Sequence, residues 1–386
     1  MNNNDYKSGQ SSASAGIAPM RVLHFVDGLS TTSGVMSVLI SYYKNIDRTA
    51  IQFDFLYFND SECSLEPDIC ALGGRCYRLP RPSPSKACYN EYRRFFEAHK
   101  DVYNILHCHP VFAGALFGKL ARSCGIKHVI QHSHSTKFGY RAGAVVRNYC
   151  LARLNPWNVT EYVACSEAAA KLLGPKSAWQ KGLFIMQNAI DCVRFSFSEE
   201  ARQEVRARYG IPASTVVIGH TGRFSPEKNH GYLMDVFEEY HRKNSDSVLM
   251  LVGDGPEKTR IQEKCRILGI EDAVIFTGNQ MAPENFLSAM DIFCFPSLYE
   301  GLTLSLLEAQ YSGLICFAAD SVPDQAFISD LLHPFSLDTE PKMVAQRMLE
   351  ETLNYDRHHA CEELSGSRYD IRICAKGLEN FYKGLR

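Results

Sequence analysis

The sequence lacks several features that would assign it to large classes of protein. It has no run of about eighteen consecutive apolar residues, so we expect no membrane-spanning helix. It has no surplus of basic residues, because 41 Lys and Arg stand against 43 Asp and Glu, with a formal net charge of -2. Since dedicated nucleic-acid-binding proteins usually carry a basic excess, we expect no nucleic acid among its partners.

Cysteine pairs and a signal-peptide pattern are absent as well. None of the 14 cysteines forms a C-x-x-C pair, and the gaps between them are irregular. A chain of 386 residues needs no disulfide framework, so we expect reduced thiols in a cytoplasmic protein. The N-terminus is rich in Asn, Ser and Gly without the apolar segment of a signal peptide, and residues 1–19 are expected to form a disordered tail.

Two common phosphate-binding motifs are also missing. No D-x-D sequence occurs, which argues against a carboxylate-chelated divalent metal holding a nucleotide diphosphate. No G-x-x-x-x-G-K-[ST] occurs, which argues against P-loop phosphoryl transfer. The turn at 252–256 (VGDGP) contains G-x-G, but Lys258 stands where the dinucleotide fingerprint has its third glycine, so the pattern favours NAD binding only weakly.

The chain instead shows a regular alternation of short apolar runs and longer segments with helical spacing. With 45% hydrophobic residues, it can form sizeable cores. The alternation predicts βαβ units and parallel sheets, and hence an α/β fold of two Rossmann-like, doubly wound domains that face each other across a cleft. We place these domains at 20–194 and 195–365, with a C-terminal helix at 366–386 that crosses back to the first domain. The predicted strands lie at 20–26, 51–58, 105–108, 128–131, 162–165, 216–220, 247–252, 274–276, 292–295 and 314–317.

The loop and helix at 296–313 (PSLYEGLTLSLLEAQYSG) carry the most informative pattern. Ligands of open α/β sheets bind outside the carboxyl ends of the strands, where this loop begins. Thr303 is a plausible N-cap, and the amides that follow, at Leu304 and Ser305, would favour an anion. Gly301 would let a ligand approach the backbone. Glu300 and Glu308 lie on either side of this helix start, and sugar hydroxyls could satisfy a partly buried Glu308.

Further candidate loops follow other strands. The loop 219–228 (GHTGRFSPEK) contains Gly222 and brings together Arg223 and Lys228, which suit a diphosphate, although a solvated surface loop is the alternative. Gly253 lies in the turn after the next strand. In the first half, the loop 27–34 ends at Gly34 and could close over a ligand or be a plain connection.

Four histidines stand at the ends of two predicted strands of the first domain. Because residues i and i+2 share a face of a strand, His107 and His109 could converge, and so could His132 and His134. A histidine in a cleft can act as acid, base or hydrogen-bond donor near neutral pH. Each of the four could equally be a structural residue, and together they could hold a metal in a metal-dependent hydrolase.

At these motifs the sequence resembles the GT-B glycosyltransferases of family 4, the retaining "glycosyl transferases group 1". The match covers roughly 216–313 through GRFSPEKNH, LVGDGP, FTGNQ and DIFCFPSLYEGLTLSLLEAQYSG, and more loosely the first half. Within this family, the sequence looks most like bacterial exopolysaccharide and capsule enzymes. In the stretch where the family commonly has Gly and Pro, this chain has Thr303, Leu304 and Ser305.

The resemblance implies a role for each matching residue. It places Glu308 at the ribose of the nucleotide, Glu300 at the donor sugar, and Arg223 with Lys228 at the diphosphate. Backbone groups at Leu304 and Ser305, together with Gly34, Gly222, Gly253, Gly301 and Thr303, would complete the donor site. His109 would contact the donor sugar or the reacting centre, and we assign His132 and His134 to the acceptor.

We therefore expect a retaining, metal-independent glycosyltransferase without a cofactor. It would move a sugar from a nucleotide diphosphate donor, a UDP-sugar in our interpretation, to a saccharide or lipid-linked acceptor. Lys137, Arg141 and Arg147 lie among apolar and aromatic residues and suggest peripheral contact with the inner face of a membrane. The alternatives are a sugar-nucleotide epimerase or hydrolase of the same architecture and the metal-dependent hydrolase.

Overall fold

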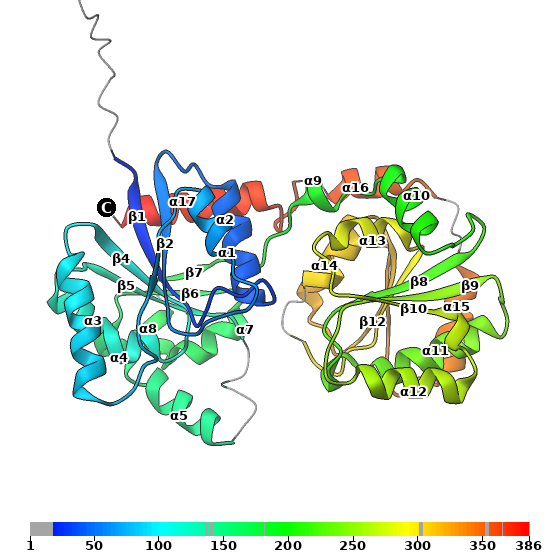
Figure 1. The fold of residues 1–386 in the computed structure, drawn as a ribbon, viewed down its shortest axis with the longest axis horizontal. Coiled ribbons are helices and arrows are strands. Elements are labelled where there is room, and N and C mark those ends of the chain that lie inside the picture. The colour runs from blue at the N-terminus through cyan, green and yellow to red at the C-terminus, as the bar shows by residue number, and fades with distance from the viewer. Residues whose placement is uncertain are drawn as a thin grey trace, which may run out of the picture.

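Two parallel β-sheets organise the chain in the computed structural model, which describes residues 18–135, 138, 142–180, 182–300, 304–351, 355–364 and 366–385. Each sheet is covered by helices on both faces, and the two sheets belong to two lobes that lie side by side (Figure 1). The expected architecture of two doubly wound α/β domains is thus confirmed. Nearly all of the tail predicted at 1–19 lies outside the described residues.

The first sheet has seven strands in the order β3-β2-β1-β4-β5-β6-β7, all paired in parallel. Its strands are nearly continuous apolar runs, as expected where helices cover both faces. The strands are β1 (Met20–Phe25), β2 (Ile51–Tyr57), β3 (Cys76–Arg78), β4 (Tyr103–Cys108), β5 (His128–Ser133), β6 (Glu161–Ala164) and β7 (Leu183–Ile185). The helices are α1 (Gly34–Asn45), α2 (Glu66–Ala71), α3 (Lys86–Ala98), α4 (Ala113–Ser123), α5 (Ala142–Ala152), α6 (Asn155–Asn158), α7 (Glu167–Ala170), η1 (Lys171–Leu173) and α8 (Lys176–Trp179).

The second sheet has six parallel strands in the order β10-β9-β8-β11-β12-β13. The strands are β8 (Val216–Thr221), β9 (Ser247–Val252), β10 (Val274–Gly278), β11 (Ile292–Phe295), β12 (Ile315–Ala319) and β13 (Leu332–Phe335). The helices are α9 (Cys192–Phe195), α10 (Glu199–Arg208), η2 (Pro226–Lys228), α11 (His230–His241), α12 (Lys258–Leu268), η3 (Glu271–Ala273), α13 (Pro283–Ala289), α14 (Leu304–Tyr311), η4 (Asp324–Ala326), α15 (Pro341–Glu350) and α16 (Arg357–Leu364).

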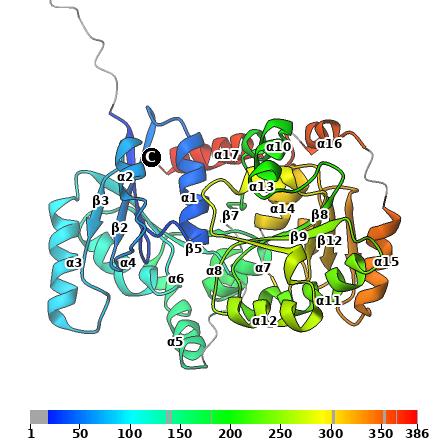
Figure 2. The ribbon, with the colours of Figure 1, turned by 45° about the vertical axis from the view of Figure 1, so that its right-hand side comes forward.

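The chain passes between the lobes twice, and the two crossings are hydrogen-bonded to each other. The Ile190 amide donates to the carbonyl of Tyr369 at 2.7 Å, and the Ile371 amide donates to the carbonyl of Ile190 at 2.9 Å. After the second crossing, α17 (Ile371–Gly384) returns to the first lobe and packs against α1 (Figure 2). Its Tyr382 is fully buried in the first lobe's core.

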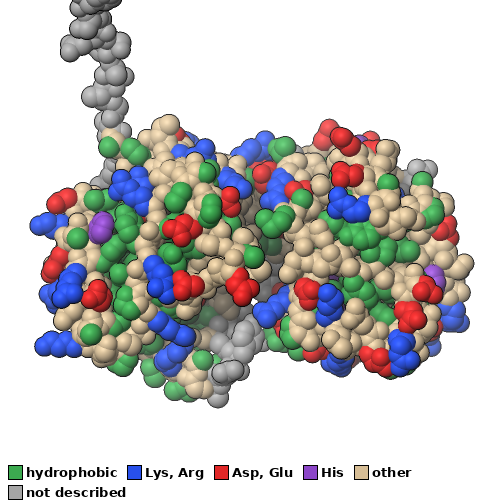
Figure 3. All heavy atoms as spheres, in the orientation of Figure 1, with side chains coloured by type: hydrophobic (Ala, Val, Ile, Leu, Met, Phe, Trp, Pro, Cys, Tyr) green, Lys and Arg blue, Asp and Glu red, His purple; other side chains and the backbone are tan. Residues whose placement is uncertain are grey.

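Each sheet has one point where the strand order reverses, and these points determine where a ligand can bind. In the first sheet the reversal lies between β1 and β4, and in the second it lies between β8 and β11. In doubly wound folds, the crevice at the carboxyl ends of the two strands beside the reversal is the ligand site. The molecular surface is indented between the two lobes (Figure 3).

Candidate active site

The loops at the carboxyl ends of β8 and β9 are joined backbone to backbone. The Gly222 amide donates to the carbonyl of Val252 at 2.9 Å, and the Phe224 amide donates to that of Asp254 at 3.0 Å. Gly253 lies so close that a Cβ atom there would stand 2.0 Å from the carbonyl oxygen of Gly222. Gly253 also has a φ of +141°, which side chains rarely allow. Two of the predicted glycines therefore fix the shape of this loop pair.

The Lys228 side chain links this loop pair to the loop after β11. Its Nζ donates to Oε1 of Glu300 at 2.7 Å, and the two side chains are only 15% and 14% exposed. The ammonium also lies 4.8 Å from the centre of the Phe295 ring, a cation–π contact. The structure thus unites two predicted site residues, 72 positions apart in the chain, at the strand-order reversal of the second sheet.

Arg223 lies in the same loop as Lys228 but is exposed to solvent. Burial opposes ionisation of Glu227, but a hydrogen bond donated by Ser225 lowers the pKa of its carboxyl, and the charges of Lys228 and Arg223 lower it further. The loop therefore presents two cations, one held by Glu300 and one facing solvent. An anion with several oxygens, such as a diphosphate, is the kind of ligand that such a pair binds.

Glu308 projects from the second turn of α14 and is only partly exposed. Burial raises the pKa of its carboxyl to about 7, Arg194 opposes this rise, and Glu284 adds to it. Arg194 itself forms a two-pronged ion pair with Glu284, with both N–O distances at 2.9 Å. A carboxylate in this setting needs hydrogen-bond donors, which the hydroxyls of a sugar or ribose would supply.

The start of α14 lies at the junction of the two lobes. Leu304, its first residue, packs against buried clusters of both domains, and Ser305 is half-buried beside it. The dipole of a helix favours anions at its first turn. Two other predicted residues of this segment, Gly301 and Thr303, lie outside the described residues.

In the first lobe, Gly34 is the first residue of α1. Ser33 caps this helix by accepting a hydrogen bond from the Met36 amide at 3.4 Å. Apart from its chain neighbours and the backbone of its own helix, no atom of the described residues lies within 4 Å of the position that a Cβ of Gly34 would take, so the backbone there is open to a ligand.

Five histidines meet at the carboxyl ends of β1, β4 and β5. His109 Nδ1 lies 2.8 Å from His134 Nε2, and His109 Nε2 lies 3.0 Å from His24 Nδ1. His107 Nε2 lies 3.2 Å from His132 Nδ1, and His107 Nδ1 lies 2.6 Å from the hydroxyl of Tyr382.

The predicted convergence of His107 with His109, and of His132 with His134, is confirmed, with ring centres 4.5 Å and 3.8 Å apart. One detail is wrong: β5 extends to Ser133, so His132 lies inside the strand and only His134 follows it. Hydrogen bonds to β6 cause this extension, because Gln131, His132 and Ser133 pair with Tyr162, Val163 and Ala164.

Burial keeps these imidazoles neutral. It lowers the pKa of His134 to about 4, and it lowers the pKa values of the other four well below the ordinary range, with contributions from neighbouring histidines. Near pH 7 each ring therefore offers one N–H donor and one lone pair, and His109 is available as a hydrogen-bonding group rather than as a cation.

Sequence reasoning missed four residues of these clusters. His24 is the second-last residue of an apolar strand, and its only signal in the sequence is that place near the strand's carboxyl end. Arg194 and Glu284 are 90 residues apart and pair only through the fold. Tyr382 comes from the returning helix α17.

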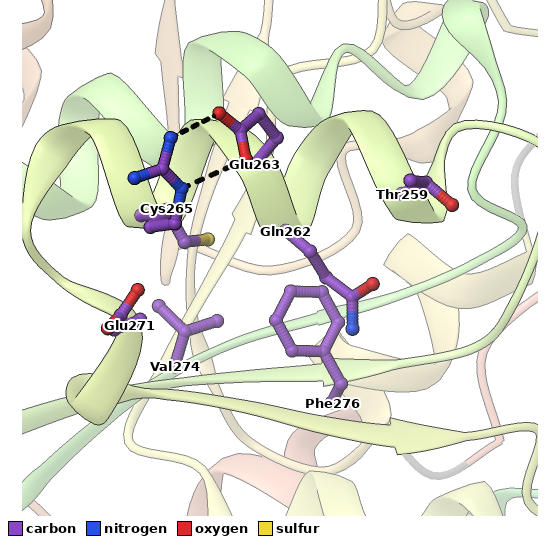
Figure 4. A pocket seen from close by; sticks show the side chains of 8 residues that line it. Thr259, Gln262, Glu263, Cys265, Glu271, Val274 and Phe276 are labelled. Atoms are coloured by element: carbon purple, nitrogen blue, oxygen red, sulfur yellow. Dashed lines mark hydrogen bonds and ion pairs between the residues drawn. The ribbon is translucent and has the colours of Figure 1, made fainter.

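Two recesses of the surface lie away from the Lys228–Glu300 pair. One, of about 440 Å³, lies between α12 and β10, and its Arg266 and Glu263 pair with each other (Figure 4). None of the predicted site residues that the structure describes lines it. The other, of about 970 Å³, is formed by α7, η1 and α8 of the first lobe with Gln325 of the second. It is lined by Arg153, Lys171, Lys176 and Trp179.

Comparisons with known proteins agree with this geometry. Residues 201–354 match the family model "Glycosyl transferases group 1". The chain is 31% identical over 310 residues to the putative glycosyltransferase EpsF of Bacillus subtilis, covering 79% of this chain and 80% of that protein. It is 25% identical over 57% of its length, and 59% of the relative's, to the Escherichia coli UDP-Gal:alpha-D-GlcNAc-diphosphoundecaprenol alpha-1,3-galactosyltransferase.

Among solved structures, Anabaena Alr3699/HepE in complex with UDP superposes with a TM-score of 0.77. It shares 15% sequence identity, and the match covers 94% of this chain and all of that one. This likeness shows that the two lobes have the expected GT-B arrangement. From the family model and the long match to EpsF, it follows that this chain belongs to the group 1 glycosyl transferases and is an enzyme of that family.

Proposed function

We propose that the protein is a retaining, metal-independent glycosyltransferase that moves a sugar from a UDP-sugar to a lipid-linked saccharide in exopolysaccharide or capsule biosynthesis. The observation that carries this proposal is the half-buried Lys228–Glu300 pair at the strand-order reversal of the second sheet. Arg223 lies exposed in the same loop as Lys228, and α14, which carries Glu308 in its second turn, follows the loop of Glu300 in the chain.

The donor would bind with its diphosphate against Arg223, Lys228 and the first amides of α14. Glu308 would accept hydrogen bonds from the ribose, and Glu300 would contact the transferred sugar. The slow step is departure of the nucleotide diphosphate as the sugar becomes cationic. Preorganised donors aimed at such developing charge each contribute about 10²–10³ in rate. These assignments rest on the family resemblance together with the positions of the residues.

Uridine as the base is supported by the names of two similar proteins. The Escherichia coli relative uses UDP-Gal by its name, and the structurally similar HepE was crystallised with UDP. Independence from metal is supported by the absence of a D-x-D sequence and by the two cations, which would neutralise the diphosphate. Retention is proposed from the family resemblance and would follow a same-face, ion-pair-like route.

A lipid-linked acceptor is supported by the lining of the 970 Å³ recess. The described residues that line it include three cations, Arg153, Lys171 and Lys176, and one carboxylate, Glu167, and Trp179 adds an aromatic face. The cations of this recess would bind the oxygens of a phosphate or diphosphate that is linked to an apolar tail. Arg153, which directly follows α5, belongs to the same lobe as His132 and His134. The recess is therefore a second candidate contact for the acceptor on the lobe to which we assign it.

The apolar tail would be met by an exposed face of α5 and α6. Val146, Tyr149 and Trp157 are 63%, 46% and 70% exposed, and Val145 and Leu154 in the same stretch of chain are exposed as well. Arg147 and Arg153 provide basic groups, and the Arg153 guanidinium lies 4.8 Å from the centre of the Tyr149 ring. Basic and aromatic residues around an apolar helix face are typical of contact with anionic lipid surfaces. Lys137 and Arg141, predicted for the same contact, lie outside the described residues.

No helix in the described parts of the chain is both long and apolar enough to span a bilayer. Peripheral contact can therefore be tested by sedimentation with vesicles that contain an anionic lipid. Replacing Val146 and Trp157 by Ser should reduce the bound fraction severalfold. The matched control is Met281→Ser, which removes a residue that is 84% exposed on the other lobe. Equal binding of both variants, or no binding of the parent protein, would contradict membrane contact at α5 and α6.

The transferase activity is tested first by a thermal-shift panel of UDP, GDP, uridine and their sugar conjugates. A ligand present well above its dissociation constant raises the melting temperature of the folded state. UDP and one UDP-sugar should stabilise the protein in the presence of EDTA. Stabilisation by GDP-mannose alone would contradict the uridine assignment, and a requirement for metal would contradict metal independence.

The products then distinguish the alternatives. Incubation of the stabilising donor with membrane lipid extract should give a lipid-linked glycan whose new bond keeps the anomeric configuration of the donor, as read by NMR. Consumption of donor at the same rate without acceptor would favour the epimerase or hydrolase. Loss of all activity on chelation, with stoichiometric zinc in the active protein, would favour the metal-dependent hydrolase.

A further inference from the structure

The histidine cluster of the first lobe has the composition of a metal site rather than of an ordinary polar core. One ring nitrogen from each of His109, His132 and His134 lies within 4.8 Å of the others. Three neutral imidazoles whose nitrogens lie around one position are a common ligand set for Zn²⁺ and related transition metals. His134 is the most accessible of the three, since it is half-buried, whereas His109 and His132 are 7% and 1% exposed.

One nitrogen of this group is unused. Nε2 of His132 is buried and, within the described part of the chain, has no hydrogen-bond partner. A buried polar atom without a partner is costly, because it has given up its hydrogen bond to water. A cation held by His132 Nε2, His109 Nδ1 and His134 Nε2 would satisfy it. The last two nitrogens are 2.8 Å apart, and a tetrahedral ion with bonds of about 2.0–2.1 Å requires a slightly wider separation.

The two remaining histidines lie where supporting groups of a metal site belong. A metal-bound histidine almost always donates its second N–H to an acceptor, which fixes its tautomer and orientation. His132 Nδ1 lies 3.2 Å from His107 Nε2, and His109 Nε2 lies 3.0 Å from His24 Nδ1. His107 can pass its own N–H from Nδ1 to the Tyr382 hydroxyl at 2.6 Å.

A second trio, His24, His107 and His109, also places its nitrogens within 4.8 Å. All three of its members are buried, at 0%, 0% and 7% exposure, so that no side is left open for water or an anion. A divalent cation enclosed by neutral ligands alone would carry a large desolvation cost. The trio with the half-buried His134 avoids this cost, because solvent can supply a fourth ligand.

We propose that His109, His132 and His134 form a binding site for one divalent transition-metal ion, with Zn²⁺ as the physiological candidate, and that His24 and His107 orient the ligands. The ion would not assist transfer. Because the family resemblance places His109 at the donor sugar, a bound ion would compete with substrate for this side chain.

The test is direct binding of Zn²⁺ to the full chain without a histidine tag, by equilibrium dialysis and elemental analysis. One ion per chain is expected, and Co²⁺ in its place should give the intense visible absorption of a tetrahedral site. Loss of the ligand in His134→Ala should weaken binding more than about 100-fold, because loss of a supporting partner alone costs 10–100-fold. His107→Gln should fall within that smaller range and still bind one ion.

The matched control is His359→Ala, which removes a 68% exposed histidine of α16 that lies 3.6 Å from Glu363. It should bind Zn²⁺ as tightly as the parent protein. Less than one ion per chain in the parent, or unchanged affinity in His134→Ala with its melting temperature preserved, would overturn the proposal. These readouts do not involve glycosyl transfer, so failure of the metal site and failure of the proposed function are distinguishable.

Discussion

Replacing Glu308 by Gln should make the protein more stable at alkaline pH while it abolishes donor binding. Burial raises the pKa of the Glu308 carboxyl from 4.5 to about 7 in the folded protein. The folded state therefore holds a proton that the unfolded state has released between these two pH values. Stability contributed by the protonated group is complete below pH 4.5 and is lost as the pH rises towards 7. Glutamine has nearly the same shape but does not ionise, so the Glu308→Gln variant loses no stability at this position over the same pH interval.

The size of the effect follows from the same shift. At about 1.36 kcal/mol for each pH unit, ionisation of Glu308 costs about 3 kcal/mol above pH 7. Because the side chain keeps partial access to solvent, we expect about 2 kcal/mol at pH 8.5 and about 1 kcal/mol at pH 5.5. For a domain of this size, about 2 kcal/mol corresponds to a rise in melting temperature of about 4–8 °C.

The assay is calorimetric unfolding of the parent protein, Glu308→Gln and a control, Glu363→Gln, from pH 5.5 to pH 8.5. Glu363 is 67% exposed on α16, so its replacement should leave the melting temperature unchanged at every pH. The gap between Glu308→Gln and the parent should widen as the pH rises. A gap that is constant or that narrows would refute the assignment of Glu308 as a carboxylate destabilised by burial. In the same variant, UDP should no longer raise the melting temperature, because Glu308 is our proposed ribose ligand.

Three further predictions concern the second lobe. Lys228→Met should lower turnover by about 10²–10³ while the protein still folds, measured as product per enzyme at saturating donor; turnover at the parent rate would contradict its role at the leaving group. Gly253→Ala should destabilise the protein by about 1–3 kcal/mol in chemical denaturation and weaken UDP binding, since its Cβ would meet the Gly222 carbonyl at a φ that side chains rarely allow. Gly210→Ala, at a φ of +66° with open space around it, should cost less and leave UDP binding unchanged. Arg206→Met should destabilise the protein by about 3–5 kcal/mol, because this buried guanidinium pairs with a carboxylate and four carbonyls, yet UDP affinity below the melting temperature should stay unchanged.

The sequence predicted the central strands well and the outer strands poorly. The limits of β9 and β11 agree with the prediction to the residue, because central strands are short apolar runs with clear ends. Three short edge strands, β3, β7 and β13, were not predicted. The first two are only three residues long and partly exposed, and β13 contains Pro334, which a ladder tolerates only at an edge.

The candidate site was predictable as a set of loops but not as a set of contacts. Because parallel strands end at the same edge of a sheet, loops after strands could be identified as one region from the sequence alone. The pairing of Lys228 with Glu300 could not be predicted from the sequence, because 72 residues separate them and only the fold brings them together. The only signal of His24 was its place near the carboxyl end of an apolar strand, and Tyr382 reaches His107 only because α17 returns to the first lobe.

The central claim is that the side chains of Arg223 and Lys228 bind the diphosphate of the donor. Titration calorimetry of UDP and of uridine, each into the parent protein and into a variant with both cations replaced by Ala, tests it most directly. UDP should bind the parent at least about 100-fold more tightly than uridine does, and this advantage should nearly vanish in the double variant, while uridine affinity stays the same. A double variant that still prefers UDP by the full factor would show that the diphosphate lies elsewhere.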